Sequence, residues 1–272
     1  MKFSVLMSVY NLENHKFLKK ALESIIINQK TKPDEIVIVE DGVLSNELSD
    51  VVESFKKKSN IISVKNKFNL GLGKSLNKGL KYCSNEWIFR MDSDDISNFN
   101  RFYEQIKFIK QNPNVVAFSC NIIEFKKTPG DLKRIRKVPL SYKNILDFSQ
   151  MRNPINHMCA VFKKSEVLKV GGYKHINGYE DYYLWLRLLK NNKIILNQNL
   201  SLLYARIGNN MISRRGGYKL FISEIKFQKL ILSEGISSFP QFIINIFIRA
   251  FPRLFGKIIL KLIYKQILRN ES

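Results

Sequence analysis

The chain has 272 residues, of which 45% are hydrophobic and 25% are charged, a balance that excludes a disordered or collagen-like chain and supports a sizeable core. Its 45 Lys and Arg residues outnumber 23 Asp and Glu residues, so the net charge is +22. This excess predicts an anionic partner such as nucleic acid, a phospholipid surface or a phosphorylated substrate.

Neither a disulfide framework nor a zinc site is expected. Cys83, Cys120 and Cys159 are scattered, odd in number and form no Cys-x-x-Cys pair, which suits a reducing compartment. The apolar run at residues 3–9 is too short for a signal peptide, and polar residues follow it. No stretch reaches the roughly 18 clean apolar residues of a spanning helix, so we expect none. The cysteine pattern leads us to expect a cytoplasmic protein.

The first 120 residues alternate between strand and helix patterns. Continuous apolar runs predict buried strands, and apolar residues at helical spacing predict helices between them. The expected strands are residues 3–9, 35–39, 61–64, 87–91 and 115–119, and the expected helices are residues 16–28, 48–55, 72–82 and 102–111. This rhythm with short connections predicts an α/β fold with an open, mostly parallel sheet.

Sheets of this kind bind ligands beyond the carboxyl ends of their strands, so the residues after each strand are the first candidates for a site. They are Tyr10-Asn11, Glu40-Asp41-Gly42, Asn66 to Asn69, and Asp92-Ser93-Asp94-Asp95. Carboxylates gather there in a chain that is otherwise poor in them, and this is the first indication of function.

The second part of the chain begins with a basic stretch, residues 126–137, which we expect to form an exposed loop that is either simply solvated or faces an anion. Ordered elements then resume. They are a strand at 158–162, a short helix at 165–170 that ends at Gly171-Gly172, an amphipathic helix that opens at Tyr179-Glu180-Asp181, and strands at 194–197 and 202–205.

Residues 236–272 differ from the rest in composition. They carry six basic residues and one acidic residue, a net charge of +5, and the basic residues recur every four positions from Arg249 to Arg269. Phe, Ile and Leu fill the positions between them, and Pro252 is expected to divide the segment into two helices. A basic face beside an apolar face is typical of a helix lying in a membrane interface. The alternatives are a helix pair packed on the domain and contact with nucleic acid, for which no motif is present.

Three carboxylates lie within four positions in Asp92-Ser93-Asp94-Asp95, where they repel one another unless a cation is present. Oxygen ligands of this type suit Mg²⁺ or Mn²⁺, which bridge protein carboxylates and substrate phosphates. An aspartate-rich turn is the alternative. The position directly after a buried strand favours the metal site.

Two further acidic pairs admit two interpretations each. The carboxylate of Asp41 could accept hydrogen bonds from a base or a ribose, or it could belong to a simple turn before Gly42. Glu180 and Asp181 lie at a helix N-terminus, where they could serve as a cap and dipole partner or as a general base.

Six motifs occur in one order: Ser8-Val9-Tyr10-Asn11, Val39-Glu40-Asp41-Gly42, Asn69-Leu70-Gly71-Leu72 through Asn77, Met91-Asp92-Ser93-Asp94-Asp95, Gly171-Gly172-Tyr173, and Glu180-Asp181-Tyr182-Tyr183-Leu184-Trp185. Together they resemble family 2 glycosyltransferases of the GT-A fold, of the bacterial polysaccharide and O-antigen type, over roughly residues 3–215. The C-terminal tail is similar to the basic, hydrophobic extension that such enzymes often carry.

The resemblance implies an inverting, metal-dependent transfer from a nucleotide-diphosphate sugar, with Mn²⁺ or Mg²⁺ as cofactor. By family habit the donor is a UDP-sugar and the acceptor a glycan or a polyprenyl-linked sugar. We expect peripheral attachment to the inner membrane through the tail and no nucleic-acid partner.

In the same pattern Asp181, with Glu180 beside it, is the base that deprotonates the acceptor hydroxyl. The residues implied in donor binding are Val9, Tyr10, Glu13, Asp41, Asn69, Lys74, Arg90, Asp92, Ser93 and Arg206. The residues implied as metal ligands are Asp94, Asp92 and His157. The pattern departs from the family at Leu76, where an Arg is common, and Lys74 is the candidate to replace it.

We expect residues 1–120 to form the nucleotide-sugar-binding half, residues 121–235 the half that binds acceptor and supplies the base, and residues 236–272 the membrane-associating tail. Two other functions are weighed against this one. A sugar-phosphate nucleotidyltransferase would need a glycine-rich phosphate loop where the chain has Tyr10-Asn11-Leu12-Glu13. A non-catalytic basic binding protein would account for the charge and leave the strand-end carboxylates unexplained.

Overall fold

A computed structural model describes residues 1–254 of the chain, apart from residue 177 and residues 209–216. The strands are β1 (Ser4–Tyr10), β2 (Glu35–Asp41), β3 (Ile61–Lys65), β4 (Trp87–Asp92), β5 (Ile96–Ser97), β6 (Ala117–Phe125), β7 (Arg134–Arg136), β8 (Val161–Lys163) and β9 (Ile195–Arg206). The helices are α1 (His15–Ile26), α2 (Asn46–Lys56), α3 (Leu72–Tyr82), α4 (Arg101–Gln111), α5 (Tyr142–Ser149), α6 (Lys164–Lys169), α7 (Glu180–Lys190), α8 (Tyr218–Ser233) and α9 (Phe239–Asn245). The alternation predicted for the first part of the chain is confirmed.

One sheet runs through the domain in the order β3-β2-β1-β4-β8-β6-β9-β5, with β7 paired to β6. Strands β1 to β4 are parallel to one another, β6 is parallel to β9, and β8 joins the two groups by antiparallel pairing with β4 and β6. The two expected halves of the domain therefore share one sheet. The register places Tyr10 beside Asp41 and Ser8 beside Asp92, so the candidate residues after three strands meet at one edge.

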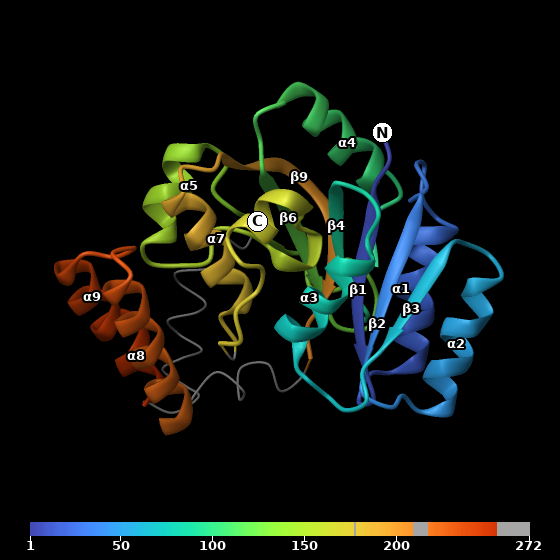
Figure 1. Ribbon diagram of the computed structural model, residues 1–272, viewed down its shortest axis with the longest axis horizontal. Helices are drawn as coiled ribbons and strands as arrows, with labels where there is room; N and C mark the ends of the chain where they lie inside the picture. Colours follow the sequence, from blue (N-terminus) through green and yellow to red (C-terminus); the bar gives the residue numbers. More distant parts are fainter. Residues whose placement is uncertain (177, 209–216, 255–272) are drawn as a thin grey trace.

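The central strands are buried on both faces, as their continuous apolar runs predict. Val5, Met7 and Val9 point to one side, where they pack with α1, α2 and α4, and Leu6 points to the other side, where α3 and α7 cover the sheet. Alternate side chains of a strand face opposite ways, so a strand with no polar alternation needs a layer on each side. Figure 1 shows α3 and α7 in front of the sheet.

Helix α8 lies outside this three-layer body and packs on α7 (Figure 1). Tyr179, Tyr182, Tyr183 and Leu186 form a separate apolar cluster with Phe227 of α8. The sequence analysis did not predict α8, nor α5. The residues of α8 do not follow one simple apolar stripe, because its buried face also carries the polar residues Glu224 and Gln228.

Several expected boundaries are corrected. The two expected late strands are parts of one strand, β9. Its pairing with β6 is irregular opposite Cys120 to Ile122, and the polar residues that separate the two apolar runs of β9 lie at this irregularity. The expected strand at 158–162 is divided into a short 3-10 turn (η1, His157–Cys159) and β8. Part of the basic loop, Arg134–Arg136, is a strand because it pairs with β6.

The tail continues α9 through a π-helical turn (η3, Ile246–Ala250) to a 3-10 turn (η4, Phe251–Arg253) that contains Pro252. Arg249 and Arg253 form ion pairs with Glu224 of α8 at 2.7 and 2.6 Å. These two arginines therefore do not belong to a solvent-facing basic stripe. The other four basic residues of the tail, Lys257, Lys261, Lys265 and Arg269, lie outside the described residues.

Over the residues that the structure describes, no helix has the length and apolar character needed to cross a bilayer.

Candidate active site

The donor side of the site is built where β1, β2 and β4 end. Asp41, at the end of β2, is buried, and its two carboxylate oxygens accept hydrogen bonds from the Asn66 side chain and from the backbone N–H groups of Leu70 and Gly71. Gly42 follows with φ +94°, and a Cβ there would lie 3.0 Å from the Asn69 nitrogen. Asp41 thus holds the loop of residues 66–71 against the strand end, and its contact with a nucleobase stays a prediction.

Acidic side chains of two elements meet beside this loop. Burial, followed by the charges of Asp94 and Asp92, raises the pKa of Glu13 to about 7, and a hydrogen bond with Ser93 opposes the rise. Burial and the charge of Asp92 raise the pKa of Asp94 to about 6. Burial is thus the main cause of both raised pKa values, and repulsion between the neighbouring carboxylates adds to it.

Arg90 is the buried cation of this cluster. Its side chain is 1% exposed and pairs with the Asp92 carboxylate, which is 33% exposed, at 2.5 Å. Because Arg90 is buried and Asp92 is partly exposed, Arg90 holds the Asp92 carboxylate from the protein interior. The structure shows Arg90 paired with Asp92, and its expected contact with the donor stays a prediction.

Arg206, at the end of β9, is held against the same strand end. Its backbone N–H donates to the Asp95 carboxylate at 2.7 Å and its Nε donates to the Asp94 carbonyl at 3.0 Å. The guanidinium lies 3.7 Å from the ring centre of Phe17 and 4.4 Å from that of Phe125. A planar cation stacked in this way is fixed in orientation, as recognition of a diphosphate requires.

The expected metal ligands do not by themselves form a complete cation site. In the part of the chain that the structure describes, no group of three or more His, Cys, Asp or Glu side chains could hold a metal ion. Mg²⁺ commonly takes one or two protein carboxylates and completes its shell with phosphates and water. Asp94 and the partly exposed Asp92, which pairs with Arg90, are the carboxylates that could take that role.

The acidic pair expected on the acceptor side lies in the first turn of α7. Asp181 accepts a hydrogen bond from the Asn153 side chain at 2.7 Å, and burial raises its pKa against the opposing effect of that bond and of nearby backbone N–H groups. Glu180 accepts from the Gly178 N–H at 2.9 Å, and burial raises its pKa as well. A carboxylate with a raised pKa is a better proton acceptor, so the general-base interpretation has a physical basis.

Tyr173 connects the two sides. Its backbone exchanges two hydrogen bonds with the Asn77 side chain, at 2.6 and 2.8 Å, and its hydroxyl lies 2.9 Å from Nε2 of His157. The charges of both Asp181 and Asp92 act on its hydroxyl, whose pKa is raised mainly by burial. Asp92 and Asp181 are therefore both near enough to Tyr173 for their charges to act on its hydroxyl.

His157 was expected to be a third metal ligand. Its ring lies among Tyr173 and Trp185, and burial together with the charge of Arg90 holds its pKa well below the usual range. The imidazole is therefore neutral, and Tyr173 engages its Nε2 atom. Coordination of a metal ion by His157 stays a prediction, and it would have to occur through the Nδ1 atom.

The remaining expected donor residues line the same edge. Val9 is buried beneath it, Tyr10 ends β1, Asn69 accepts a hydrogen bond from the Gly71 N–H at 3.1 Å, and Lys74 is exposed in the first turn of α3. The replacement of the missing arginine by Lys74 is not tested by any contact and stays a prediction.

Comparison with known proteins agrees with this geometry. The sequence model described as "Glycosyl transferase family 2" matches residues 4–168. The chain belongs to glycosyl transferase family 2. It is a glycosyltransferase.

Two curated relatives match it over nearly its whole length. An uncharacterized glycosyltransferase of Haemophilus influenzae is 42% identical over 99% of this chain and 100% of its own length. The UDP-Gal:alpha-D-GlcNAc-diphosphoundecaprenol beta-1,3-galactosyltransferase of Escherichia coli is 41% identical over 99% of this chain and 97% of its own length.

Solved structures confirm the GT-A fold. TarS 1–349 of S. aureus in complex with UDP-GlcNAc superposes with a TM-score of 0.65 at 22% identity, over 85% of this chain and 67% of that one. The mannosyltransferase PcManGT of Pyrobaculum calidifontis, in complex with GDP-Man and Mn²⁺, gives a TM-score of 0.62 at 16% identity, over 92% and 69%.

The sequence analysis missed the residues that hold the expected ones in place. They are Phe17, Asn77, Asp95, Phe125, Asn153 and Tyr173. Asp95 and Tyr173 lie within the recognised motifs and Asn77 ends one, so these positions carried a signal. Phe17, Phe125 and Asn153 carried none, because only the fold brings them to Arg206 and Asp181.

Proposed function

We propose that this protein is an inverting glycosyltransferase that transfers a hexose from a UDP-sugar to a hydroxyl of a lipid-linked glycan acceptor in cell-surface polysaccharide synthesis. The observation that carries the proposal is the convergence of two acidic groups. Asp92 and Asp94, with Arg90 and Arg206, form one group, and the half-buried Asp181 belongs to the other; the charges of Asp92 and Asp181 both act on the Tyr173 hydroxyl.

In the proposed reaction Asp181 accepts the proton of the acceptor hydroxyl. The acceptor oxygen then forms a bond to the anomeric carbon while the bond from that carbon to the diphosphate oxygen breaks, and the electron pair leaves with the nucleoside diphosphate. Asn153 fixes the Asp181 carboxylate through its 2.7 Å hydrogen bond. Attack opposite the leaving group inverts the anomeric centre without a protein nucleophile.

On the donor side, Arg206 binds the diphosphate and stabilises the charge that develops on it. Asp94 and Asp92 would hold Mn²⁺ or Mg²⁺. A bound divalent cation would supply further neutralisation of the leaving diphosphate.

The identity of the substrates is supported by the relatives. A 41% identical protein is named for transfer from UDP-Gal to a GlcNAc linked to diphosphoundecaprenol, and a structure of the same fold holds UDP-GlcNAc. A UDP-hexose and a sugar-diphosphate-lipid are therefore the first donor and acceptor to test, with UDP-Gal at the head of the donor panel.

A membrane surface is the partner that we propose for the tail. The residues from α9 onward expose an apolar face, in which the rings of Phe247 and Phe251 stack 5.3 Å apart. Its exposed members are Phe239, Ile243, Ile244, Phe247, Ile248, Phe251 and Leu254. An apolar face on a chain of net charge +22 can insert into an anionic bilayer while the basic residues bind its headgroups. This part of the proposal places the protein at the inner membrane as a peripheral protein.

The donor part of the proposal is tested by equilibrium binding of UDP-, GDP- and dTDP-sugars, each with and without Mn²⁺, to the wild type and to Asp94→Asn. We expect one UDP-sugar to bind tightly only with Mn²⁺, and Asp94→Asn to lose that dependence. Lys107→Met, an exposed change on α4, is the control and should bind as the wild type does. Absence of binding by every sugar nucleotide under both conditions would contradict the proposal.

A further inference from the structure

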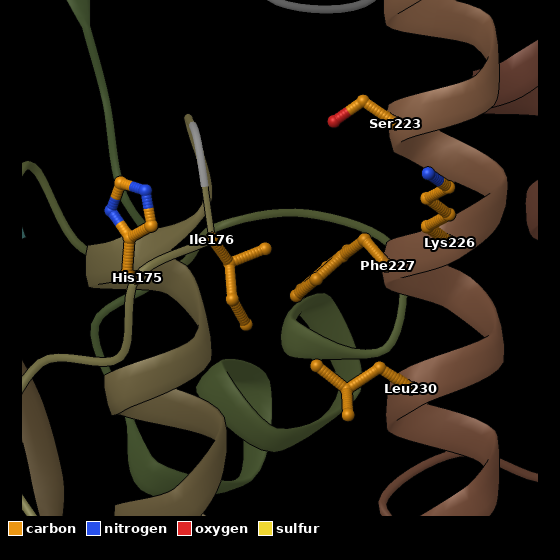
Figure 2. Close-up of a pocket in the computed structure, with 6 residues that line it drawn as sticks. All are labelled: His175, Ile176, Ser223, Lys226, Phe227 and Leu230. Carbon is orange, nitrogen blue, oxygen red and sulfur yellow. The ribbon is translucent and has the colours of Figure 1, made fainter.

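A pocket of about 290 Å³ opens between α8 and the segment that precedes α7. Figure 2 shows its six lining residues. His175 and Ile176 come from that segment, and Ser223, Lys226, Phe227 and Leu230 come from successive turns of α8. This volume is at the small end of ligand pockets, which suits one part of a larger ligand.

The lining is divided by polarity. Ile176, Phe227 and Leu230 form an apolar wall, and in Figure 2 the ring of Phe227 points across the gap toward Ile176. His175, Ser223 and Lys226 supply imidazole, hydroxyl and ammonium donors at the rim. The acidic residue next to this rim, Glu224, is neutralised by Arg249 and Arg253. An anionic group joined to an apolar chain matches this division.

The pocket wall contacts the residue that precedes the expected base. The ring of Phe227 stacks on that of Tyr179 with centres 4.3 Å apart and planes 11° apart, and Tyr179 directly precedes Glu180 and Asp181. On its other side, His175 approaches the donor loop, because a Cβ built at Gly71 would lie 3.8 Å from its Cε1 atom. A ligand in the pocket would thus lie between the loop at Gly71 and Tyr179, the residue that directly precedes the acidic pair.

We propose that this pocket binds the diphosphate and the first isoprene unit of the lipid-linked acceptor, an inference that rests on the proposed function. An acceptor sugar that presents a hydroxyl to Asp181 carries its diphosphate at the other end of one ring, so the diphosphate must lie close to the base. Lys226 pairs with the diphosphate, and His175 and Ser223 donate hydrogen bonds to it. Ile176, Phe227 and Leu230 contact the isoprene unit.

The test compares two acceptors that carry the same sugar. One is an α-GlcNAc-diphosphate joined to a short polyprenyl chain, and the other is the phenyl glycoside of GlcNAc, which has neither phosphate nor prenyl group. The quantity compared is the KM for the diphosphate acceptor divided by the KM for the phenyl glycoside. We expect Lys226→Met to raise this ratio at least tenfold. Ser223→Glu, which places a negative charge at the rim, should raise that ratio further.

Lys229→Met is the matched control, because Lys229 is an exposed lysine of the same helix that lies outside the pocket lining. Its KM ratio should equal that of the wild type. The proposal is overturned if Lys226→Met and Ser223→Glu, with wild-type thermal unfolding, leave the ratio unchanged. Failure of the wild type to transfer sugar to either acceptor from any donor would instead refute the proposed function.

Discussion

The ion-pair cluster at Glu224 should contribute strongly to stability, and Glu224→Gln measures it. Arg249 and Arg253, with side chains 15% and 16% exposed, would lose their carboxylate. Burial alone would raise the pKa of Glu224, but the attraction of the two arginines outweighs it and lowers the pKa from 4.5 to about 2. A lowering of the pKa by this amount corresponds to about 3 kcal/mol of stabilisation of the folded state. Breaking a buried pair by removing one partner costs about 3–5 kcal/mol, so we expect a loss of about 3 kcal/mol at pH 7.

The pH dependence has a definite sign. Because the folded state lowers the pKa of Glu224, its contribution is complete above about pH 4.5 and is lost as the pH falls toward 2. The free energies of unfolding of the wild type and Glu224→Gln should therefore converge below about pH 4.5. Urea unfolding followed by circular dichroism between pH 7 and pH 3 gives both quantities.

Glu53→Gln serves as the control for this measurement. It removes an exposed ion pair with Lys56 on α2, and such pairs contribute little to stability. The reasoning would be refuted if Glu224→Gln lowered the free energy of unfolding no more than the control does. It would also be refuted if the difference in free energy of unfolding between wild type and Glu224→Gln stayed constant down to pH 3.

Three further predictions follow from packing and surface. A Cβ at Gly79 would lie 2.5 Å from Leu6 Cδ1 and 2.7 Å from Val39 Cγ2, so Gly79→Ala should lower stability by about 1–3 kcal/mol; an unchanged Tm in calorimetry would contradict this. Arg206→Lys loses the planar group stacked between Phe17 and Phe125 and should raise the donor KM about tenfold in initial-rate assays, whereas an unchanged KM would remove Arg206 from donor binding. Phe247→Ser, at a ring that is 63% exposed, should weaken sedimentation with anionic vesicles, and equal binding would argue against the apolar face as the attachment.

The strand ends could be predicted from the sequence because each strand is a continuous apolar run that stops at a polar residue. Tyr10, Asp41 and Asp92 followed from that pattern alone, and the register of β1 with β2 and β4 confirms that they meet. The α/β class followed from the same alternation. The GT-A fold was predicted from the ordered motifs and is confirmed by the solved structures.

The surroundings of the site depend on contacts that no local pattern encodes. Asn153 reaches Asp181 across 28 residues, and Phe17 and Arg206 are farther apart still, so neither pair leaves a periodic signal. Helix α8 was missed because its buried face carries Glu224, whose charge is stabilised by Arg249 and Arg253 of the tail and by hydrogen bonds from Tyr179 and Gln228. The same pairs explain why these two arginines, although regularly spaced, face the domain.

The most direct test of the central claim follows the transfer reaction of wild type and Asp181→Asn with a UDP-hexose and the diphosphate-lipid acceptor. The account predicts that NMR of the wild-type product shows an anomeric configuration opposite to that of the donor. It also predicts that Asp181→Asn lowers kcat by about 10²–10⁴ while the affinity for the UDP-sugar is unchanged. A product that retains the donor configuration, or a kcat of Asp181→Asn equal to that of the wild type, would contradict it.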